Sequence, residues 1–590
     1  MSLIKVAGLK KIFTKYDDNN EIESSREVLR DINMDVEKGD FVAILGSNGS
    51  GKTTFARHLN ALLFSDEGTV TIDGEDTKSV KNIWEIRKKC GMVFQNPDNQ
   101  IVGVTVEEDA AFGLENLGVE PIKMQKRVNE SLNKTGLGKY KQKSPSRLSG
   151  GQKQRLSIAS SISMRPKCLI LDEPTAMLDP VGRKDVMKIV KELNKEDKMT
   201  IIYITHHMDE AAKADKIFVL NKGEVVTCGT PFEVFQKVDV LEQAKLTIPY
   251  VTKVAKIMNN CGFLKAYNYY NVDELIENFF KENDVSSFNS KIRKASEVSS
   301  RKKDLEKETD ISRDCILSLS NVSLCYDKGL SFENSAINNV SLNIYKDEFI
   351  GIIGHTGSGK SSLVQLMDGL IKPTDGTVKF KGMDINDKDF NKRELHFKVG
   401  MVFQYPENQL FEESVIKDVM FGPLNQGISQ ELARNKGEKA LEIMGISKDR
   451  FEASPFELSG GEKRRVAIAG VIAMEPEIII LDEPVAGLDP ETSSILLCAL
   501  KDLRDKGKTV ILISHDMENV AEYTDRVLVM NQGSVVMDDT TENVFKNQVK
   551  LKEIGLDIPI PKEVMLRLYK AGYNVNTNVL TLKDIEKELK

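Results

Sequence analysis

The sequence has few of the features that hold metal clusters, cross membranes or attract nucleic acid by charge. Its seven cysteines form no Cys-x-x-Cys pair, which argues against zinc and iron–sulfur sites. No apolar run approaches the roughly 18 residues that a membrane-spanning helix needs. Residues 1–5 lack the basic start of a signal peptide, and no long apolar stretch follows them. With a net charge of −7 and no need for an oxidising compartment, we expect a cytoplasmic protein whose main partner is not nucleic acid.

What the sequence does contain is a set of motifs that occurs twice in the same order. Lys52 and Lys360 of the first motif are 308 residues apart (360 − 52 = 308). Ser149 and Ser459 of the second motif are 310 apart (459 − 149 = 310). Chance can supply one such match, but not two whole sets in register. Because 590 residues are also too many for one core, we interpret the chain as a duplicated module.

The first motif, Gly-x-x-x-x-Gly-Lys-Ser/Thr, is the pattern of a phosphate-binding loop. In each half an apolar strand (41–45 and 349–353) leads into it, and a helical pattern follows from the lysine. That context lets backbone N–H groups surround phosphates while the lysine neutralises their charge. The predicted ATP-binding residues are Gly46, Ser47, Asn48, Gly49, Ser50, Gly51, Lys52, Thr53 and Thr54, with Gly354, His355, Thr356, Gly357, Ser358, Gly359, Lys360, Ser361 and Ser362 in the second half.

A second pair of apolar strands (168–171 and 478–481) ends in Asp-Glu. A carboxylate buried at such a strand end is costly unless a cation compensates it. We therefore predict that Asp172 and Asp482 bind Mg²⁺. The hydroxyls of Thr53 and Ser361 and the two glutamines named below are predicted to bind the same ions. Glu173 and Glu483 are predicted to polarise the attacking water. With further apolar strands at 200–204 and 509–513, the pattern predicts an α/β fold whose sheet is largely parallel.

Between these motifs each half carries Leu-Ser-Gly-Gly followed by Gln or Glu (148–152 and 458–462). The ordered set resembles the ATP-binding-cassette (ABC) ATPases, and the resemblance covers nearly the whole chain. It implies two tandem nucleotide-binding domains, each with a helical signature subdomain and a small C-terminal extension. It also implies that Gln95 and Gln404 contact Mg²⁺ and water, and that His206 and His515 sense the γ-phosphate.

In that family two modules pair head-to-tail with ATP between them, which we expect of the two halves here. The resemblance then assigns ATP contacts across the pair to Ser149, Gly150, Gly151, Gln152, Ser459, Gly460, Gly461 and Glu462. Tyr16 and Tyr326 stand where an aromatic ring stacks on adenine. Because both halves keep the full set, we expect both to hydrolyse ATP. Glu462 replaces the usual glutamine, and His207, beside His206, is interpreted as a bystander.

The repeat continues beyond these motifs, since Leu-x-Ile-Pro occurs at 246–249 and again at 556–559. Serine and charges of both signs dominate 281–312, where Phe288 is the only aromatic residue, and this composition is typical of a flexible linker. The predicted domains are 1–235 (first ATPase domain), 236–280 (its extension), 281–312 (linker), 313–545 (second ATPase domain) and 546–590 (its extension).

The segments that follow the two glutamines, 96–100 and 405–409, share a Pro-Asp/Glu-Asn-Gln pattern with an apolar pair after it. With the extensions, they resemble the paired ATPases of energy-coupling factor transporters, which import vitamins and transition metals. This resemblance implies a fusion of the two ATPases at the cytoplasmic face of the membrane. Its partners would be a transmembrane coupling subunit and a substrate-binding subunit. We expect the exposed carboxylates Asp98 and Glu407 to meet basic residues of a membrane subunit.

Two alternatives stay open from the sequence. One is a soluble twin-cassette ATPase that acts on ribosomes or nucleic acid, although the charge-balanced linker and the residues at 176–177 and 486–487 differ from the basic linker and Asn-His of ribosome-acting relatives. The other is a fused sugar-importer ATPase, in which one site is commonly degraded. In the energy-coupling factor family a separate membrane protein selects the transported substrate.

Overall fold

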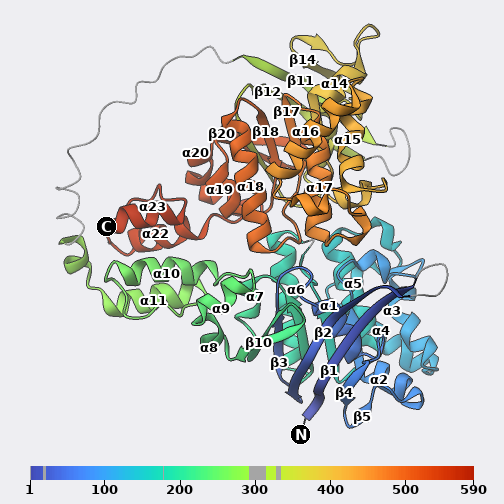
Figure 1. The fold of residues 1–590 in the computed structure, drawn as a ribbon. Coiled ribbons are helices and arrows are strands. Elements are labelled where there is room, and N and C mark those ends of the chain that lie inside the picture. The colour runs from blue at the N-terminus through green and yellow to red at the C-terminus, as the bar shows by residue number, and fades with distance from the viewer. Residues whose placement is uncertain (1, 17–21, 177, 291–313, 327–333) are drawn as a thin grey trace. The chain divides into compact units, whose positions relative to one another are not determined.

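The computed structural model describes most of the chain, drawn as a ribbon in Figure 1; the residues described are 2–16, 22–176, 178–290, 314–326 and 334–590. The described chain divides into two compact units, Met1–Tyr250 and Val251–Lys590. The first unit holds the first set of motifs. The second holds the other set together with 251–290, which were predicted to belong to the first half and the linker.

A six-stranded sheet forms the centre of each unit. Its order is β10-β9-β3-β8-β7-β6 in the first unit and β16-β17-β18-β13-β19-β20 in the second, which is the same order of equivalent strands counted from the opposite edge. The strands of the first sheet are β3 (Phe41–Leu45), β6 (Cys90–Val93), β7 (Cys168–Asp172), β8 (Thr200–Thr205), β9 (Lys216–Asn221) and β10 (Glu224–Gly229). Those of the second are β13 (Phe349–Ile353), β16 (Val399–Val402), β17 (Ile478–Asp482), β18 (Thr509–Ile513), β19 (Arg526–Asn531) and β20 (Ser534–Thr540).

All neighbours in these sheets are parallel except the antiparallel edge pairs β9–β10 and β19–β20. The predicted strands and the largely parallel sheet are therefore confirmed. Every residue of β3, β7 and β13 is buried, which explains why these strands are continuous apolar runs rather than alternating ones.

A second, antiparallel sheet packs beside the first in each unit. Its orders are β2-β1-β4-β5 and β12-β11-β14-β15. The strands are β1 (Ser2–Tyr16), β2 (Ile22–Glu37), β4 (Glu67–Ile72), β5 (Glu75–Asp76), β11 (Cys315–Tyr326), β12 (Asn334–Tyr345), β14 (Asp375–Phe380) and β15 (Met383–Asp384). Between the two sheets of the first unit lies α1 (Lys52–Leu59), whose Phe55 and Leu59 belong to the core that both sheets share. This packing fixes the start of α1, where the phosphate loop ends.

Three helices in each unit form a smaller, separate layer. They are α3 (Val106–Asn116), α4 (Pro121–Lys134) and α5 (Gly150–Ser163) in the first unit, and α15 (Val415–Asn425), α16 (Gln430–Ile443) and α17 (Gly460–Ala473) in the second. The first trio has its own core, which includes Leu114, Leu132 and Leu156. The signature motifs open α5 and α17, so the predicted helical signature subdomains are present.

The repeated Leu-x-Ile-Pro segments pack their apolar residues and introduce the C-terminal helices. Leu246, Ile248, Leu556 and Ile558 are buried. After them come α10 (Tyr250–Asn260) and α22 (Ile560–Lys570), followed by α11 (Val272–Glu282) and α23 (Leu582–Leu589). Within the second unit, α10 and α11 lie beside α22 and α23 (Figure 1).

The start of the predicted flexible linker is folded, contrary to the expectation for 281–312. Residues 285–290 are helical, and Phe288 is buried with its ring centroid 4.7 Å from Phe263 and 5.2 Å from Tyr573. The Tyr573 hydroxyl donates to the Asn283 carbonyl at 2.6 Å. Phe288 thus anchors 285–290 despite the polar composition of the segment, and the rest of the predicted linker lies outside the described residues.

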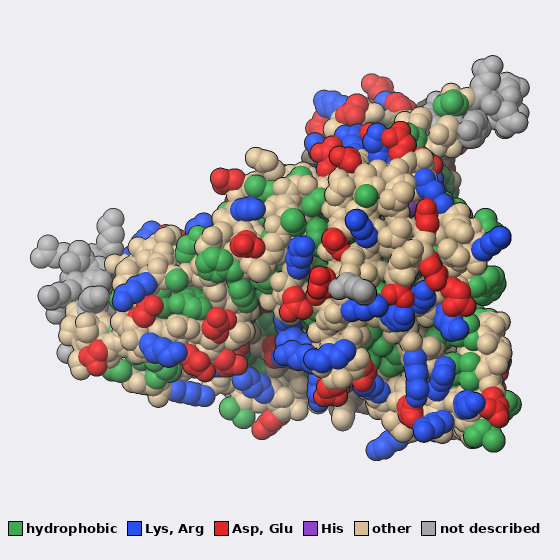
Figure 2. Space-filling model, turned by 90° about the horizontal axis from the view of Figure 1, so that it is seen from below, with side chains coloured by type: hydrophobic (Ala, Val, Ile, Leu, Met, Phe, Trp, Pro, Cys, Tyr) green, Lys and Arg blue, Asp and Glu red, His purple; other side chains and the backbone are tan. Residues whose placement is uncertain are grey.

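Charged side chains of both signs share the molecular surface. On the face drawn in Figure 2, basic and acidic side chains lie close to one another. Asp73 of the first unit illustrates this pairing, since it meets Lys38 at 3.0 Å and Lys167 at 2.6 Å, and these ammonium groups hold its pKa well below the usual range. Across the described chain, no helix is both long and apolar enough to cross a membrane.

Phe288 supplies a first prediction. Phe288→Ala should remove a buried aromatic side chain and weaken the contact between α11 and the chain after α22 by about 3–5 kcal/mol. Faster amide hydrogen exchange in α11 and at 572–574 would report this. Phe280→Ala is the matched control, because Phe280 also contacts Tyr573, by stacking, but is exposed, and its loss should cost about 1 kcal/mol. Equal exchange in the two variants would contradict the anchoring role.

Candidate functional site

In each phosphate loop, the lysine side chain donates hydrogen bonds to backbone carbonyls of the same loop. Lys52 Nζ donates to the carbonyls of Gly46 at 2.8 Å and Ser47 at 3.0 Å. Lys360 repeats this with Gly354 at 2.8 Å and His355 at 3.0 Å. Both ammonium groups are buried, so each is already desolvated at the place where negative charge is expected to bind.

The residue before each lysine must be glycine. Gly51 has φ 102° and Gly359 has φ 99°, the left-handed region that a side chain disfavours, and each is the N-cap of the helix that follows. A Cβ at Gly359 would also lie 2.5 Å from the Ala336 carbonyl. Among the residues described, the buried hydroxyls of Ser50 and Ser358 have no hydrogen-bond partner. Orphaned donors inside a loop at a helix N-terminus fit a phosphate group.

In the first unit, three predicted residues meet around the carboxylate of a fourth, Glu173. Glu173 Oε1 lies 3.6 Å from Lys52 Nζ and 3.4 Å from His206 Nδ1, and Gln95 Nε2 donates to Glu173 Oε2 at 2.9 Å. Glu173 follows β7 with φ 47°, a left-handed turn that directs its side chain differently from that of Asp172. The neighbouring carboxylates can therefore do different work.

The second unit assembles the equivalent residues with different contacts. His515 Nε2 lies 2.5 Å from Glu483 Oε1, and the Ser361 hydroxyl donates to Asp482 Oδ2 at 2.6 Å. Within the described part of this unit, Gln404 makes no counterpart of the Gln95 hydrogen bond. Glu483 shares the left-handed backbone of Glu173, with φ 51°.

The electrostatics separates the two adjacent carboxyl groups. Burial and the nearby Glu173 raise the pKa of Asp172 to about 6, although a hydrogen bond from Thr53 opposes them. Burial also acts to raise the pKa of Glu173, but His206 and Lys52 outweigh it and lower that pKa to about 2. Burial likewise raises the pKa of Asp482, against a hydrogen bond from Ser361.

The same groups could hold a divalent cation. Asp172 Oδ1 is buried with no hydrogen-bond partner in the described chain. An unpaired, desolvated carboxyl oxygen beside a hydroxyl is the oxygen donor set that Mg²⁺ prefers. The residues predicted for this ion, Thr53, Asp172 and Gln95 with Ser361, Asp482 and Gln404, thus fit it chemically, and the assignment stays a prediction.

The structure describes only one of the two tyrosine side chains predicted to stack on adenine. The Tyr326 hydroxyl lies 3.2 Å from Ser362 Oγ at the start of α13 (Lys360–Met367), and its ring is partly exposed, as a stacking position next to the loop requires. The Tyr16 side chain lies outside the described residues. His207 is half-buried beside His206, with ring centroids 4.3 Å apart, and the burial of its ring lowers its pKa well below the usual value.

The signature motifs form helix caps. Ser149 accepts a hydrogen bond from the Gln152 amide, and Gln152 Oε1 accepts one from the Ser149 amide at 3.0 Å. Glu462 makes the same reciprocal cap with Ser459, but its carboxylate also accepts the Ser459 hydroxyl proton at 2.8 Å. Burial acts to raise the pKa of Glu462, and the hydrogen bonds from Ser459 outweigh it, so this pKa is lowered. The hydroxyl of Ser459 therefore donates a hydrogen bond to Glu462, whereas the hydroxyl of Ser149 donates none to Gln152.

Comparison with known proteins agrees with this geometry. The family model described as "ABC transporter" matches residues 29–176 and 337–486. The chain belongs to the ABC transporter family. It is therefore an ATP-binding protein and an ATPase, built from two cassettes in tandem.

Relatives of this ABC ATPase cover either the whole chain or one half of it. A "Putative ABC transporter ATP-binding protein" of Methanosarcina acetivorans is 35% identical over 96% of this chain and 92% of its own length. "Energy-coupling factor transporter ATP-binding protein EcfA1" of Clostridium perfringens is 50% identical over 44% of this chain and 92% of its own length. The solved structure of cbiO1 from Clostridium perfringens is 38% identical, covers 41% of this chain and 94% of its own, and has a TM-score of 0.36.

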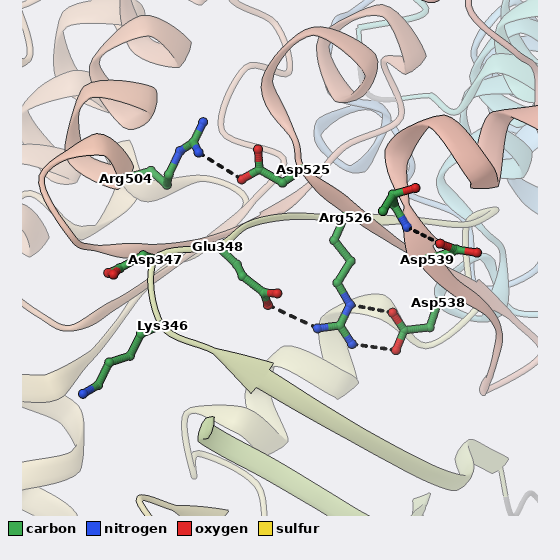
Figure 3. Close-up of a pocket in the computed structure, with 9 residues that line it drawn as sticks. Lys346, Asp347, Glu348, Arg504, Asp525, Arg526, Asp538 and Asp539 are labelled. Atoms are coloured by element: carbon green, nitrogen blue, oxygen red, sulfur yellow. Dashed lines mark hydrogen bonds and ion pairs between the residues drawn. The ribbon is translucent and has the colours of Figure 1, made fainter. Parts of the chain in front are cut away.

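A charged cavity in the second unit lies away from the ATP-binding loop. Its volume is about 610 Å³, and it is lined where β13, β19 and β20 approach one another, by Lys346, Asp347, Glu348, Arg504, Asp525, Arg526, Asp538, Asp539 and Thr540 (Figure 3). Lys346–Glu348 precede β13, whereas the phosphate loop follows its other end. Arg526 forms ion pairs with Asp538 at 2.6 Å and with Glu348 at 3.2 Å, and these pairs connect β19 to β20 and to the residue before β13.

The carboxylates beside the phosphate loops supply the second prediction. Glu173→Gln and Glu483→Gln should each lower overall ATP hydrolysis markedly, and by roughly 10²-fold or more at the altered site, because each removes the carboxylate that we predict to polarise water. Phosphate release at saturating ATP measures the effect, and ATP binding should persist. Wild-type turnover after either change would mean that the altered site is not catalytic.

The cap at Glu462 supplies the third prediction. Glu462→Gln should keep the cap, as Gln152 does in the first unit, while it frees the Ser459 hydroxyl proton. We expect ATPase activity between the wild-type value and about fivefold above it, because a half-buried charge of this kind is worth about 0–1 kcal/mol. Steady-state hydrolysis at several salt concentrations tests this. A collapse in activity would mean that the Glu462 carboxylate has a specific catalytic role.

Proposed function

We propose that this ABC ATPase is the energy-coupling component of an energy-coupling factor importer. It would power the uptake of a vitamin or transition metal through separate membrane subunits, from the cytoplasmic face of the membrane. The likeness of half the chain to EcfA1, at 50% identity, carries the proposal. Full-length relatives described as transporter ATP-binding proteins support a transport role for the fused pair.

In the proposed mechanism each half binds ATP on its phosphate loop, with Lys52 or Lys360 on the β- and γ-phosphates. Mg²⁺, held by the hydroxyl, aspartate and glutamine of each half, would neutralise phosphate charge during transfer. Glu173 and Glu483 accept the proton of the attacking water, and His206 and His515 orient those glutamates toward the γ-phosphate.

We further propose that the halves pair head-to-tail, so that each signature helix offers its N-terminal donors to the ATP of the other half. Closure on ATP and opening after hydrolysis would then move the membrane subunits. Both halves retain a complete set of carboxylate, glutamine, histidine and lysine side chains, which supports hydrolysis at both sites.

The surface after each glutamine supports attachment to a membrane partner. Val102 is 59% exposed and Phe411 is 57% exposed, whereas Leu410 is buried. Phe411 lies edge-on to the exposed Phe421, with centroids 4.9 Å apart. Apolar side chains that remain in water beside the glutamine segments are suited to a small hydrophobic contact.

We expected the carboxylates of both segments to be exposed and available to basic residues of a partner, but in the structure both are already paired. Asp98 stays exposed but already pairs with Lys153 at 2.7 Å. Glu407 is engaged with the buried Arg464 at 2.9 Å and offers little free charge. The apolar residues therefore become the better test of docking.

The fourth prediction is that Val102→Glu together with Phe411→Glu abolishes co-purification of integral membrane proteins from detergent-solubilised membranes, and ATP-driven uptake with it. ATP affinity should stay within about twofold, because neither residue contacts a phosphate loop. Val80→Glu with Val549→Glu is the matched control, since both valines are exposed and lie outside these segments.

The competing function, a soluble twin-cassette ATPase acting on ribosomes or nucleic acid, makes the opposite prediction. If the wild-type chain brings down no membrane protein but sediments with ribosomes in an ATP-dependent manner, the transport proposal is wrong. Normal assembly of the Val102/Phe411 variant would exclude this surface as the contact.

A further inference from the structure

The two halves connect the glutamine segment to the signature helix in different ways. In the first unit Asp98, in η2 (Pro97–Asn99), pairs with Lys153 at the surface, where the Asp98 side chain is 61% exposed. In the second unit Glu407, in η5 (Pro406–Gln409), receives two hydrogen bonds from Arg464, Nε to Oε2 at 3.0 Å and Nη2 to Oε1 at 2.9 Å. The Arg464 side chain is only 6% exposed.

Arg464 has no cationic counterpart in the first half. Counting from the signature serines, Gln154 occupies its place, one position after Lys153. Gln154 is buried, and its Nε2 finds no hydrogen-bond partner among the described residues. The forked cation is therefore specific to the second half, although the motifs around it are nearly the same.

The same guanidinium reaches the loop that carries the catalytic glutamate. Arg464 Nη1 donates to the Ala486 carbonyl and makes a longer contact of 3.5 Å with the Pro484 carbonyl. Ala486 in turn donates its amide to the Glu483 carbonyl at 3.2 Å. One side chain on α17 thus joins η5 on one side to the turn after Glu483 on the other.

A buried guanidinium cannot release one partner freely. Removing a partner from a buried ion pair leaves an uncompensated charge in a poorly solvated place, and that is strongly unfavourable. The bidentate geometry also fixes the plane of the guanidinium, which a point charge such as lysine would not do. A displacement of η5 is therefore passed to Arg464 and on to the Glu483 turn.

We propose that Arg464 is a positioning residue that links η5 to the Glu483 turn, so that the second ATP site senses the position of the segment after Gln404. In the described part of the first half, where the exposed Asp98–Lys153 pair is the link, no such connection is present. The proposal rests on the proposed function only for what displaces η5, namely a membrane subunit. The link itself can be tested on the isolated chain.

The test measures single-turnover hydrolysis of radiolabelled ATP by the full chain. Glu407→Gln in a Glu173→Gln background reports on the second site. Misplacement of a catalytic group by about 1 Å can lower the rate on the order of 10²-fold. We expect Glu407→Gln to shift Glu483 by less than this and therefore to slow hydrolysis roughly tenfold. The ATP concentration at half-maximal rate should change less than about twofold, since the phosphate loop is untouched. Asp98→Asn in a Glu483→Gln background is the matched control and should leave the rate of the first site within about twofold.

A double-mutant comparison separates positioning from general damage. Arg464→Gln, which copies Gln154, should slow the second site as much as Glu407→Gln, and the double variant should be no slower than either single one. Independent effects would instead multiply. The proposal is wrong if Glu407→Gln leaves the hydrolysis rate unchanged, or if Asp98→Asn lowers the rate of its own site equally. It is also wrong if the rate losses of the two single variants multiply in the double variant. A rise in the half-saturating ATP concentration as large as the loss of rate would contradict it too.

If Arg464→Gln does not fold, the comparison of Glu407→Gln with Asp98→Asn still decides, because each of these two changes keeps an acceptor oxygen for the cation that it faces. These assays contain no membrane. Failure of the Arg464 link therefore leaves co-purification of membrane subunits unaffected, and failure of co-purification leaves the link standing.

Discussion

Two adjacent carboxylates at the end of a fully apolar strand are the constraint on which each cassette depends. Asp172 and Glu173 are both buried, as is Asp482, and neighbouring charges so placed cannot both be ionised without compensation. Lys52 and His206 compensate Glu173, while one oxygen of Asp172 has no hydrogen-bond partner among the residues that the structure describes. The phosphate loop, which holds the lysine, and the strand, which holds the acids, must therefore pack together for the site to exist.

The duplicated motifs do not produce duplicated contacts. Gln95 bonds to Glu173, but His515 approaches Glu483 more closely than His206 approaches its own glutamate. Glu462 engages the hydroxyl of its signature serine, and Arg464 replaces a neutral Gln154. Each difference arises from one side chain near a buried charge, where the low effective dielectric makes small geometric changes energetically large.

The C-terminal extensions show how local composition can mislead. Residues 281–290 are polar on average, yet Phe288 packs between Phe263 and Tyr573, which are 310 positions apart in the chain (573 − 263 = 310). A single aromatic ring buries enough surface to order a short segment when a preformed pocket receives it. Such a pocket exists only after the two extensions of the second unit have packed together.

Sequence alone determined the duplication and the parallel sheets, because these depend on local patterns that recur in register. The same patterns predicted the phosphate loops and the acids, lysines, histidines and signature residues of the two sites. It also indicated the family that the comparison then established. It could not determine that Glu407 pairs with Arg464, that Ser459 donates to Glu462, or that residues 285–290 are folded. Those features depend on which side chains meet across long stretches of chain, and only the tertiary packing, which sets burial and hydrogen-bond geometry, decided them.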